Sequence, residues 1–223
     1  MRTRSGFDRE IQLLQEQILL MGSMVEKQLD RSIAALRTLD HDLARRVIEG
    51  DDEIDRLRFQ IEEHAIQLIA TQAPMASDLR AIVAALSIVV DMERMGDHAE
   101  GIAKITLMHG DLPLLKPLVD IPRMADIARG MLHRALDAFV EKDADAARRI
   151  AEEDDEVDLL YNQVYRELLT YMLNDPRTID RATWLLWVAH NLERIADRAT
   201  NICERVVFLA TGQMPEVGTG SVR

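Results

Sequence analysis

The sequence of 223 residues is poor in aromatic residues, glycine and proline, and it contains a single cysteine. Aromatic residues make up 4% of the chain and hydrophobic residues 48%, so leucine, isoleucine, valine, alanine and methionine must fill the core. Ten glycines and six prolines are few for a protein built from many short strands and turns. A lone cysteine, Cys203, excludes an intrachain disulfide and a CxxC metal site. This composition favours long helices.

The sequence also lacks a long hydrophobic run and an excess of positive charge. Its longest apolar run, residues 81–90, would span roughly 15 Å as a helix, whereas a bilayer core needs ~30 Å. The first ten residues, MRTRSGFDRE, do not have the apolar segment of a signal peptide. A formal net charge of −12 disfavours nucleic acid as a partner and favours cations as ligands. We therefore expect a cytoplasmic protein with no membrane span and no nucleic-acid partner.

An internal repeat organises the chain. The string DDEIDRL begins at Asp51 and DDEVDLL begins at Asp154, while MERMGDHA begins at Met92 and LERIADRA begins at Leu192. Two pairs of similar strings in the same order, each about 100 residues apart, predict a duplicated unit.

Apolar residues recur at steps of three and four along two stretches of the first unit, which predicts helices with coiled-coil-like seams. These seams consist of Phe7, Ile11, Leu14, Ile18, Met21 and Val25, and then of Leu43, Val47, Ile54, Leu57, Ile61 and Leu68. A turn around residues 72–74 ends the second helix, because Pro74 cannot continue it. A third helix is predicted over residues 77–109, with Ser77 as its N-cap. The seam expected to face the core in this helix consists of Leu79, Val83, Leu86 and Val90.

Three prolines between residues 113 and 122 mark the boundary between the units. Helices of the second unit are predicted at about 122–141, 144–173 and 178–211, with a break at residues 174–176. The predicted domains are a first three-helix repeat at 1–112, a second at 113–212 and a flexible tail at 213–223. Long helices joined by short loops pack antiparallel. The expected fold is therefore all-α, with two tandem three-helix bundles, six long antiparallel helices and an internal pseudo-twofold.

Each unit carries two pairs of acidic residues spaced four apart, so that both members of a pair lie on one helix face. The pairs are Asp51 with Asp55, Glu93 with Asp97, Asp154 with Asp158, and Glu193 with Asp197. Antiparallel packing of the second and third helices of a unit places its two pairs at one level, and Glu93 and Asp97 continue the seam of their helix. Like charges at this spacing repel, which suggests that a cation lies between them. Carboxylate oxygens favour hard cations such as Mg, Ca, Mn or Fe.

The alternative is that these carboxylates form solvated helix faces and caps. His98 follows Glu93 by five residues and is either a ligand or a group behind the ligands, but Arg198 stands at the equivalent position of the second unit and excludes a symmetric histidine ligand. Asn201 is either a ligand or a polar contact between helices, and Gly101 is its counterpart. A packed, hydrogen-bonded role is expected for His190. For Cys203 the expected role is that of a small core residue.

The acidic pairs and the strings around them resemble the PhoU family. ASDLR at 76–80, MERMGDHAE at 92–100, TYMLNDPRTI at 170–179 and LERIADRATNICE at 192–204 are similar to family sequences, and the likeness runs from about residue 7 to residue 212. The resemblance implies a duplicated three-helix fold with an E/DxxxD motif on two helices of each repeat. It also implies a cytoplasmic and typically homodimeric protein. Some members bind iron or other metals at these motifs.

The resemblance further implies a regulator of phosphate uptake and phosphate homeostasis. Such proteins link the ATPase of the phosphate ABC transporter to the phosphate-sensing histidine kinase and keep the phosphate regulon off when phosphate is ample. Fe, Mn, Mg or Zn ions are the cofactors considered. Two alternatives stay open: a carboxylate-bridged metalloenzyme and a metal-free structural helical module. Against the enzyme, no histidine has a glutamate three residues before it, and no GxxxxGK[ST], GxGxxG or GxSxG motif is present. We therefore expect a protein that is not an enzyme.

Overall fold

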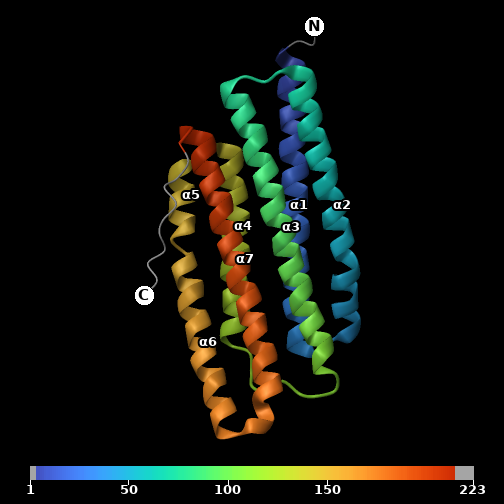
Figure 1. The fold of residues 1–223 in the computed structure, drawn as a ribbon, viewed down its shortest axis with the longest axis vertical. Coiled ribbons are helices and arrows are strands. Elements are labelled where there is room, and N and C mark those ends of the chain that lie inside the picture. Colours follow the sequence, from blue (N-terminus) through green and yellow to red (C-terminus); the bar gives the residue numbers. More distant parts are fainter. Residues whose placement is uncertain (1–3, 214–223) are drawn as a thin grey trace.

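Residues 4–213 are described by the structure, a computed structural model, and they form long helices with no strands in this range. The first repeat contains α1 (Arg4–Thr38), α2 (His41–Gln72) and α3 (Ala76–His109). The second contains α4 (Asp120–Glu141), α5 (Ala144–Ala151), α6 (Asp154–Asn174), the 3₁₀ turn η1 (Pro176–Thr178) and α7 (Ile179–Thr211). The helices of each repeat run up and down along one long axis (Figure 1). The predicted fold class, two tandem three-helix bundles, is confirmed.

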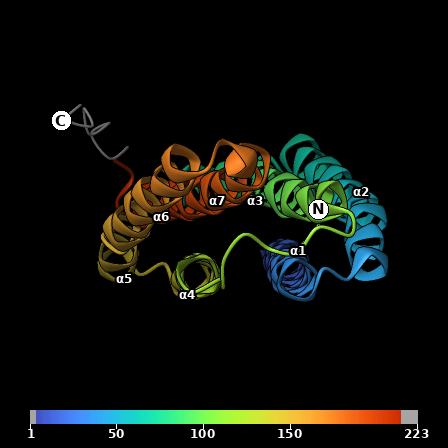
Figure 2. The ribbon, with the colours of Figure 1, turned by 90° about the horizontal axis from the view of Figure 1, so that it is seen from below.

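The two bundles lie side by side. Figure 2 shows α2, α3, α7 and α6 next to one another in one layer, with α1 and α4 in a second layer. The bundles pack against each other through α3 with α7 and through α1 with α4. One large core cluster draws its buried side chains from both bundles. The seams predicted for α1 and α2 belong to this core, except that Leu43 and Val47 pack in a smaller second cluster. The central residues Ile18, Met21, Ile54 and Ile61 are almost completely buried.

The turn between the first two helices has the same construction in both repeats. Asp40 caps α2 by accepting a hydrogen bond from the Leu43 amide, and Asp143 caps α5 by accepting bonds from the amides of residues 145 and 146. The preceding residues, Leu39 and Lys142, both adopt the left-handed conformation, with φ of 52° and 56°. An aspartate at the N-cap satisfies amides that the first helical turn leaves unpaired. The duplication is thus preserved in backbone geometry as well as in sequence.

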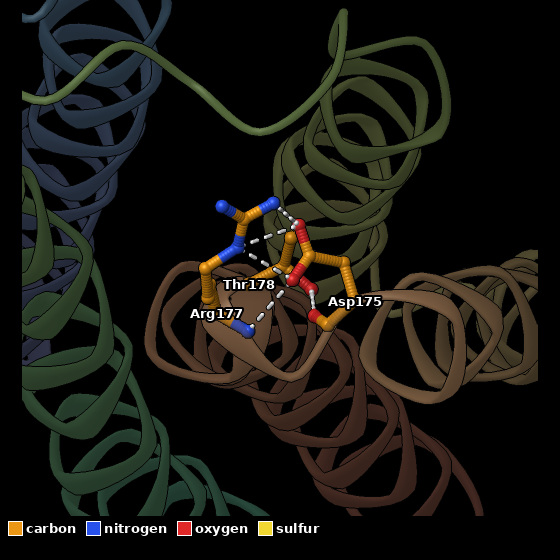
Figure 3. Close-up of polar contacts among 3 residues, drawn as sticks. All are labelled: Asp175, Arg177 and Thr178. Atoms are coloured by element: carbon orange, nitrogen blue, oxygen red, sulfur yellow. Dashed lines mark hydrogen bonds and ion pairs between the residues drawn. The ribbon is translucent and has the colours of Figure 1, made fainter.

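A second polar turn joins α6 to α7 at the predicted break. Asp175 accepts hydrogen bonds from the amide and the guanidinium of Arg177, and the Thr178 hydroxyl donates to the Asp175 carbonyl oxygen at 2.7 Å (Figure 3). Pro176 begins the 3₁₀ turn, where its fixed φ and missing N–H cost nothing. This turn reverses the chain so that α7 runs antiparallel to α6.

Two details of the predicted helices are wrong. The helix expected over residues 144–173 is divided into α5 and α6 at Glu152 and Glu153. There Arg134 of α4 holds the Glu153 carboxylate through two hydrogen bonds of 2.5 and 2.6 Å, and the acidic first turn of α6 suits a new helix N-terminus. Likewise, α3 begins at Ala76 with Met75 as its N-cap and no side-chain cap, so Ser77 is not the cap.

The expected boundary between the domains at residues 112 and 113 falls in the segment that joins α3 to α4. The tail predicted over residues 213–223 lies outside the described residues except for Gln213. Over residues 4–213, none of the helices combines the length and the apolar character needed to cross a membrane.

Candidate metal centres

The first acidic cluster lies where α2 packs against α3. Asp51 is partly buried there, and Gln28 of α1 donates a hydrogen bond of 2.8 Å to its Oδ1 atom. On α3, a Cβ atom added at Gly96 would lie 3.0 Å from the same oxygen. Because glycine has no side chain, the Asp51 carboxylate can approach the α3 backbone. Asp51 is therefore held at the junction of all three helices of its repeat.

The electrostatics of this cluster disfavour full ionisation. Burial raises the pKa of Asp51 to about 6, and the negative charges of Glu100, Asp97 and Asp55 push the pKa in the same direction. Burial also raises the pKa of Asp97, with further contributions from Glu93 and Asp55. A carboxylate is made less acidic by the loss of solvent and by nearby negative charge. The carboxylates of α2 and α3 therefore act on one another as a single negative patch.

The second cluster shows the same arrangement between α6 and α7. Burial, followed by the charges of Asp197, Asp158 and Glu193, raises the pKa of Asp154 to about 7. The pKa values of Asp158 and Glu193 are also raised, first by burial and then by Asp197. Asp154 Oδ1 is buried with no hydrogen-bond partner in the structure, and Glu193 Oε2 is buried with only His190 Nδ1 near it, at 3.4 Å. A buried carboxylate oxygen without a partner, beside like charges, is a natural place for a cation.

Arginines already neutralise part of each cluster. Arg58 forms an ion pair of 2.7 Å with Glu93, and Arg194 forms one of 2.5 Å with Asp197. Within residues 4–213, no three acidic, histidine or cysteine side chains are gathered closely enough to hold one metal ion. The donor chemistry thus fits a hard cation, but Arg58 and Arg194 compete with a bound cation for the carboxylates of Glu93 and Asp197. Metal ligation by the eight predicted residues stays a prediction.

Comparison with known proteins supplies the family. The sequence profile described as the PhoU domain matches this chain twice, at residues 18–106 and 121–206. The chain belongs to the PhoU family. A relative from Caulobacter vibrioides, named a phosphate-specific transport system accessory protein PhoU homolog, is 43% identical over 212 residues, covering 95% of this chain and 92% of the relative. A PhoU homolog from Aquifex aeolicus is 42% identical over 206 residues, covering 92% of this chain and 93% of its own length.

Solved structures of the PhoU family share the fold. The crystal structure of PhoU from Pseudomonas aeruginosa superimposes with a TM-score of 0.88 at 37% identity, covering 93% of this chain and all of that one. A second crystal structure, the phosphate transport system regulatory protein PhoU from Streptococcus pneumoniae, gives a TM-score of 0.88 at 33% identity, covering 95% of this chain and all of that one. The relatives from Caulobacter vibrioides and Aquifex aeolicus are named accessory proteins, and the one from Streptococcus pneumoniae is named a regulatory protein.

The outward side of α3 was predicted wrongly. Leu79 and Val83 are 38% and 43% exposed, and Leu86 and Val90 are only partly buried. The buried side of α3 instead carries Ile82, Ala85, Ile88, Val89, Met92, Met95, Ala99 and Ile102. Glu93 and Asp97 do continue the seam of Leu79 and Val83, but this seam faces away from the core. The carboxylates of Glu93 and Asp97 consequently face solvent on the layer formed by α2, α3, α7 and α6, on the side away from α1 and α4.

Polar contacts at the junction of α3 with α7 connect the two repeats. His98 Nδ1 lies 2.9 Å from Asn191 Oδ1, and Arg198 lies 3.5 Å from Asp91 Oδ1. Asn201 donates a hydrogen bond of 3.2 Å to the same Asp91 oxygen. Asn201 is therefore a polar contact between helices, one of the two predicted alternatives. His98 points at α7, so it supports the junction and not the first acidic cluster.

Sequence reasoning missed this junction, although the repeat contained a signal. Position 91 holds aspartate where position 191 holds asparagine, and position 198 holds arginine where position 98 holds histidine. Because α3 and α7 run antiparallel, Asp91 of the first repeat contacts Arg198 of the second, and His98 of the first repeat contacts Asn191 of the second. Two other expectations can be compared with the structure: Cys203 is buried as a core residue, whereas His190 is mostly exposed, lies 3.4 Å from Glu193 and contacts the ring of Tyr161.

Proposed function

We propose that this protein regulates phosphate uptake and phosphate homeostasis from the cytoplasmic side of a phosphate ABC transporter. In this role it associates with the transporter ATPase and with a phosphate-sensing histidine kinase, and it keeps the phosphate regulon off when phosphate is ample. The supporting observation is the match of the PhoU domain to both repeats, together with relatives named as accessory proteins of the phosphate-specific transport system. The role requires binding to partners and no catalytic step.

We further propose that the two acidic clusters hold hard metal ions. Asp51, Asp55, Glu93 and Asp97 would hold them in the first repeat, and Asp154, Asp158, Glu193 and Asp197 in the second. Burial, and after it repulsion between the carboxylates, raises the pKa values of Asp51 and Asp154, and a bound cation would offset both effects by stabilising the ionised form. Iron, manganese, magnesium and zinc are all candidates, because oxygen donors alone do not select one of them strongly.

A deletion strain grown with ample phosphate tests the regulatory role. Phosphatase expression should rise in the deletion strain and return to its low level on complementation with the wild-type gene. Pull-downs from the complemented strain should recover the transporter ATPase and the sensor kinase. Unchanged phosphatase expression in the deletion strain would contradict the proposal.

Metal analysis of the same purified protein tests the acidic clusters. The double variant Asp97→Ala with Asp197→Ala should lose bound metal. The matched control is Asp42→Ala with Asp145→Ala, because these exposed aspartates also occupy equivalent positions of the two repeats but lie in the first turns of α2 and α5, where each pairs with an arginine three residues later. Equal metal content in the two double variants would reject metal binding at the clusters and leave the regulatory role standing.

A further inference from the structure

An open groove runs along the outer layer between α3 and α7. Its lining residues are Val83, Leu86, Ser87, Val90, Asp91 and Arg94 on α3, and Arg198, Asn201 and Arg205 on α7. The two acidic clusters lie on either side, one between α2 and α3 and the other between α6 and α7. The groove itself is different in character: three of its nine lining residues are arginines and only one is acidic, in a chain whose net charge is −12.

The α3 wall of the groove carries an apolar seam that is only partly covered by the core. Leu79, Val83, Leu86 and Val90 follow one another at steps of four, three and four, the spacing with which a helix contacts a second helix in a coiled coil. Leu79 and Val83 nevertheless expose 38% and 43% of their surface. A row of exposed apolar side chains at this spacing is the form of a helix-docking surface.

Arginines on both walls of the groove make positive charge available to a ligand. Arg198 makes one long contact, 3.5 Å to Asp91 Oδ1, and its Nε atom is buried without a hydrogen-bond partner. Arg94 is exposed and forms no ion pair with any residue in the described range. Arg80 continues the charge toward the start of α3, where it lies beside Gly212. Guanidinium groups with spare donors bind carboxylates through charge-assisted hydrogen bonds.

The repeat provides an internal comparison, because the same junction exists at the other end of α3 and α7. The residues equivalent to Arg80, Arg198 and Arg205 are Asp180, His98 and Ile105. Ser87 of the groove corresponds to Trp187, a far larger side chain. Only Arg94 keeps its charge at the other end, as Arg194. The remaining arginines and the small side chain of Ser87 therefore belong to one end of the junction and do not follow from the duplicated architecture.

We propose that this groove is a docking surface for an amphipathic helix of a protein partner, with acidic side chains flanking its apolar seam. The lining of α3 from Val83 to Arg94 covers a helix length of about 16 Å, which suits about three turns of a helix better than a small anion. Apolar residues of the partner pack on the α3 seam while its carboxylates reach the arginines. This inference rests on the proposed role in which the protein acts by binding partners.

A designed peptide tests the docking surface directly. The probe is a fluorescein-labelled amphipathic helix of about 21 residues, with leucines at steps of three and four and glutamates beside them. Comparison peptides replace the glutamates by lysines or scramble the order of the same residues. Fluorescence anisotropy of the full chain should show saturable one-to-one binding of the acidic peptide, and a rise in salt concentration should weaken it.

Exposed positions allow variants that keep the fold intact. Val83→Asp should weaken binding by about tenfold or more, because the loss of one buried valine contact costs about 1.5 kcal/mol. Arg94→Glu should weaken it as well, through repulsion of the peptide's carboxylates. The matched controls are Ile66→Asp and Arg56→Glu on the outer face of α2, away from the groove, where Ile66 is 60% exposed. Both controls should bind the acidic peptide as the wild type does.

Several outcomes would overturn the inference. Binding of the lysine or scrambled peptide as tightly as the acidic peptide would do so, as would binding of the acidic peptide by the Val83→Asp variant with the affinity of the wild type. Displacement of the peptide by inorganic phosphate to the same extent in the wild type and in Val83→Asp would also contradict it. A self-associated chain that Val83→Asp dissociates would assign the groove to a second copy instead. No transporter, kinase or metal is present in this assay, so its failure would leave the proposed regulatory role untouched. Conversely, normal phosphatase control in the deletion strain would reject that role without affecting the peptide result.

Discussion

Replacement of Asp154 by asparagine should stabilise the metal-free protein at neutral pH. Burial and neighbouring carboxylates raise the pKa of Asp154 from its ordinary value of 3.8 to about 7. The fold therefore prefers the protonated form, whereas the unfolded chain releases the proton near pH 3.8. The unfolded state is favoured increasingly as the pH rises between these values, so the free energy of unfolding falls from about pH 4 to about pH 7 and is constant above. Because asparagine cannot ionise, the free energy of unfolding of the Asp154→Asn variant should not fall in this way.

The pKa values set the size of the effect. A difference between 3.8 and about 7, at about 1.4 kcal/mol for each pH unit, gives a ceiling of about 4 kcal/mol. Asp154 is only partly buried, and solvent in the cleft screens its neighbours, so we expect about 1–2 kcal/mol at pH 8. For a chain of this size that corresponds to a rise in Tm of roughly 2–8 °C.

Urea unfolding in the presence of a chelator, followed by circular dichroism, measures the difference. The Asp154→Asn variant should be more stable than the wild type at pH 8, and its advantage should shrink steadily as the pH falls toward 4. Asp52→Asn is the control, because Asp52 is exposed and should give no such trend. A variant that is less stable than the wild type at pH 8, or an advantage that does not depend on pH, would refute the electrostatic argument.

Two further predictions concern the arginine that screens the second cluster and the junction between the repeats. Arg194→Ala releases Asp197 from its 2.5 Å ion pair, so Mn²⁺ should bind the purified variant more tightly in calorimetry. The control Arg123→Ala, at an exposed ion pair, should leave the affinity unchanged. Weaker Mn²⁺ binding after Arg194→Ala would contradict the view that Arg194 competes with the metal. Asn191→Leu removes the 2.9 Å partner of His98 and should lower the free energy of unfolding by about 1–3 kcal/mol, and an unchanged urea midpoint would show that this contact contributes nothing.

Much of the fold could be predicted because local signals and the repeat agree. The seam through Ile18 and Met21, the break before Pro176 and the duplicated acidic strings all indicate the same three-helix unit. Periodicity is informative when one side of a helix is apolar and the other is polar, as in α1 and α2. In such a helix the residue types alone predict which side is buried, without any knowledge of the neighbouring helices.

The orientation of α3 could not be predicted in this way. Between residues 81 and 90 almost every side chain is apolar, because α3 packs against α1, α2 and α7. Two different seams then satisfy the helical period equally well, and the sequence offers no polar face to choose between them. The seam of Leu79 and Val83 is the one predicted to face the core, whereas the structure buries the seam that contains Ile82 and Ile88. Partners, and not propensity, decide the orientation of such a helix.

The same limit explains why the positions of the acidic pairs were predictable while their surroundings were not. Spacing along the chain places Glu93 and Asp97 on one face, but the ion pair from Arg58 depends on the rotation of α2 against α3. Arg194 pairs within its own helix, where a carboxylate three residues away is always within reach. Both arginines reduce the negative charge that the acidic motifs alone suggest.

Divergence of the two repeats is constrained by the contacts between them. Asp91 faces Arg198, and Asn191 faces His98, so each contact joins a residue of one repeat to a residue of the other. Replacement of Asp91 alone by asparagine would leave the partly buried Arg198 guanidinium without its carboxylate partner. An unpaired buried charge lowers the free energy of unfolding strongly. Residues in direct contact do not contribute independently to stability. The differences between the repeats at positions 91, 98, 191 and 198 are therefore best considered as contacting pairs, because Asp91 contacts Arg198 and His98 contacts Asn191.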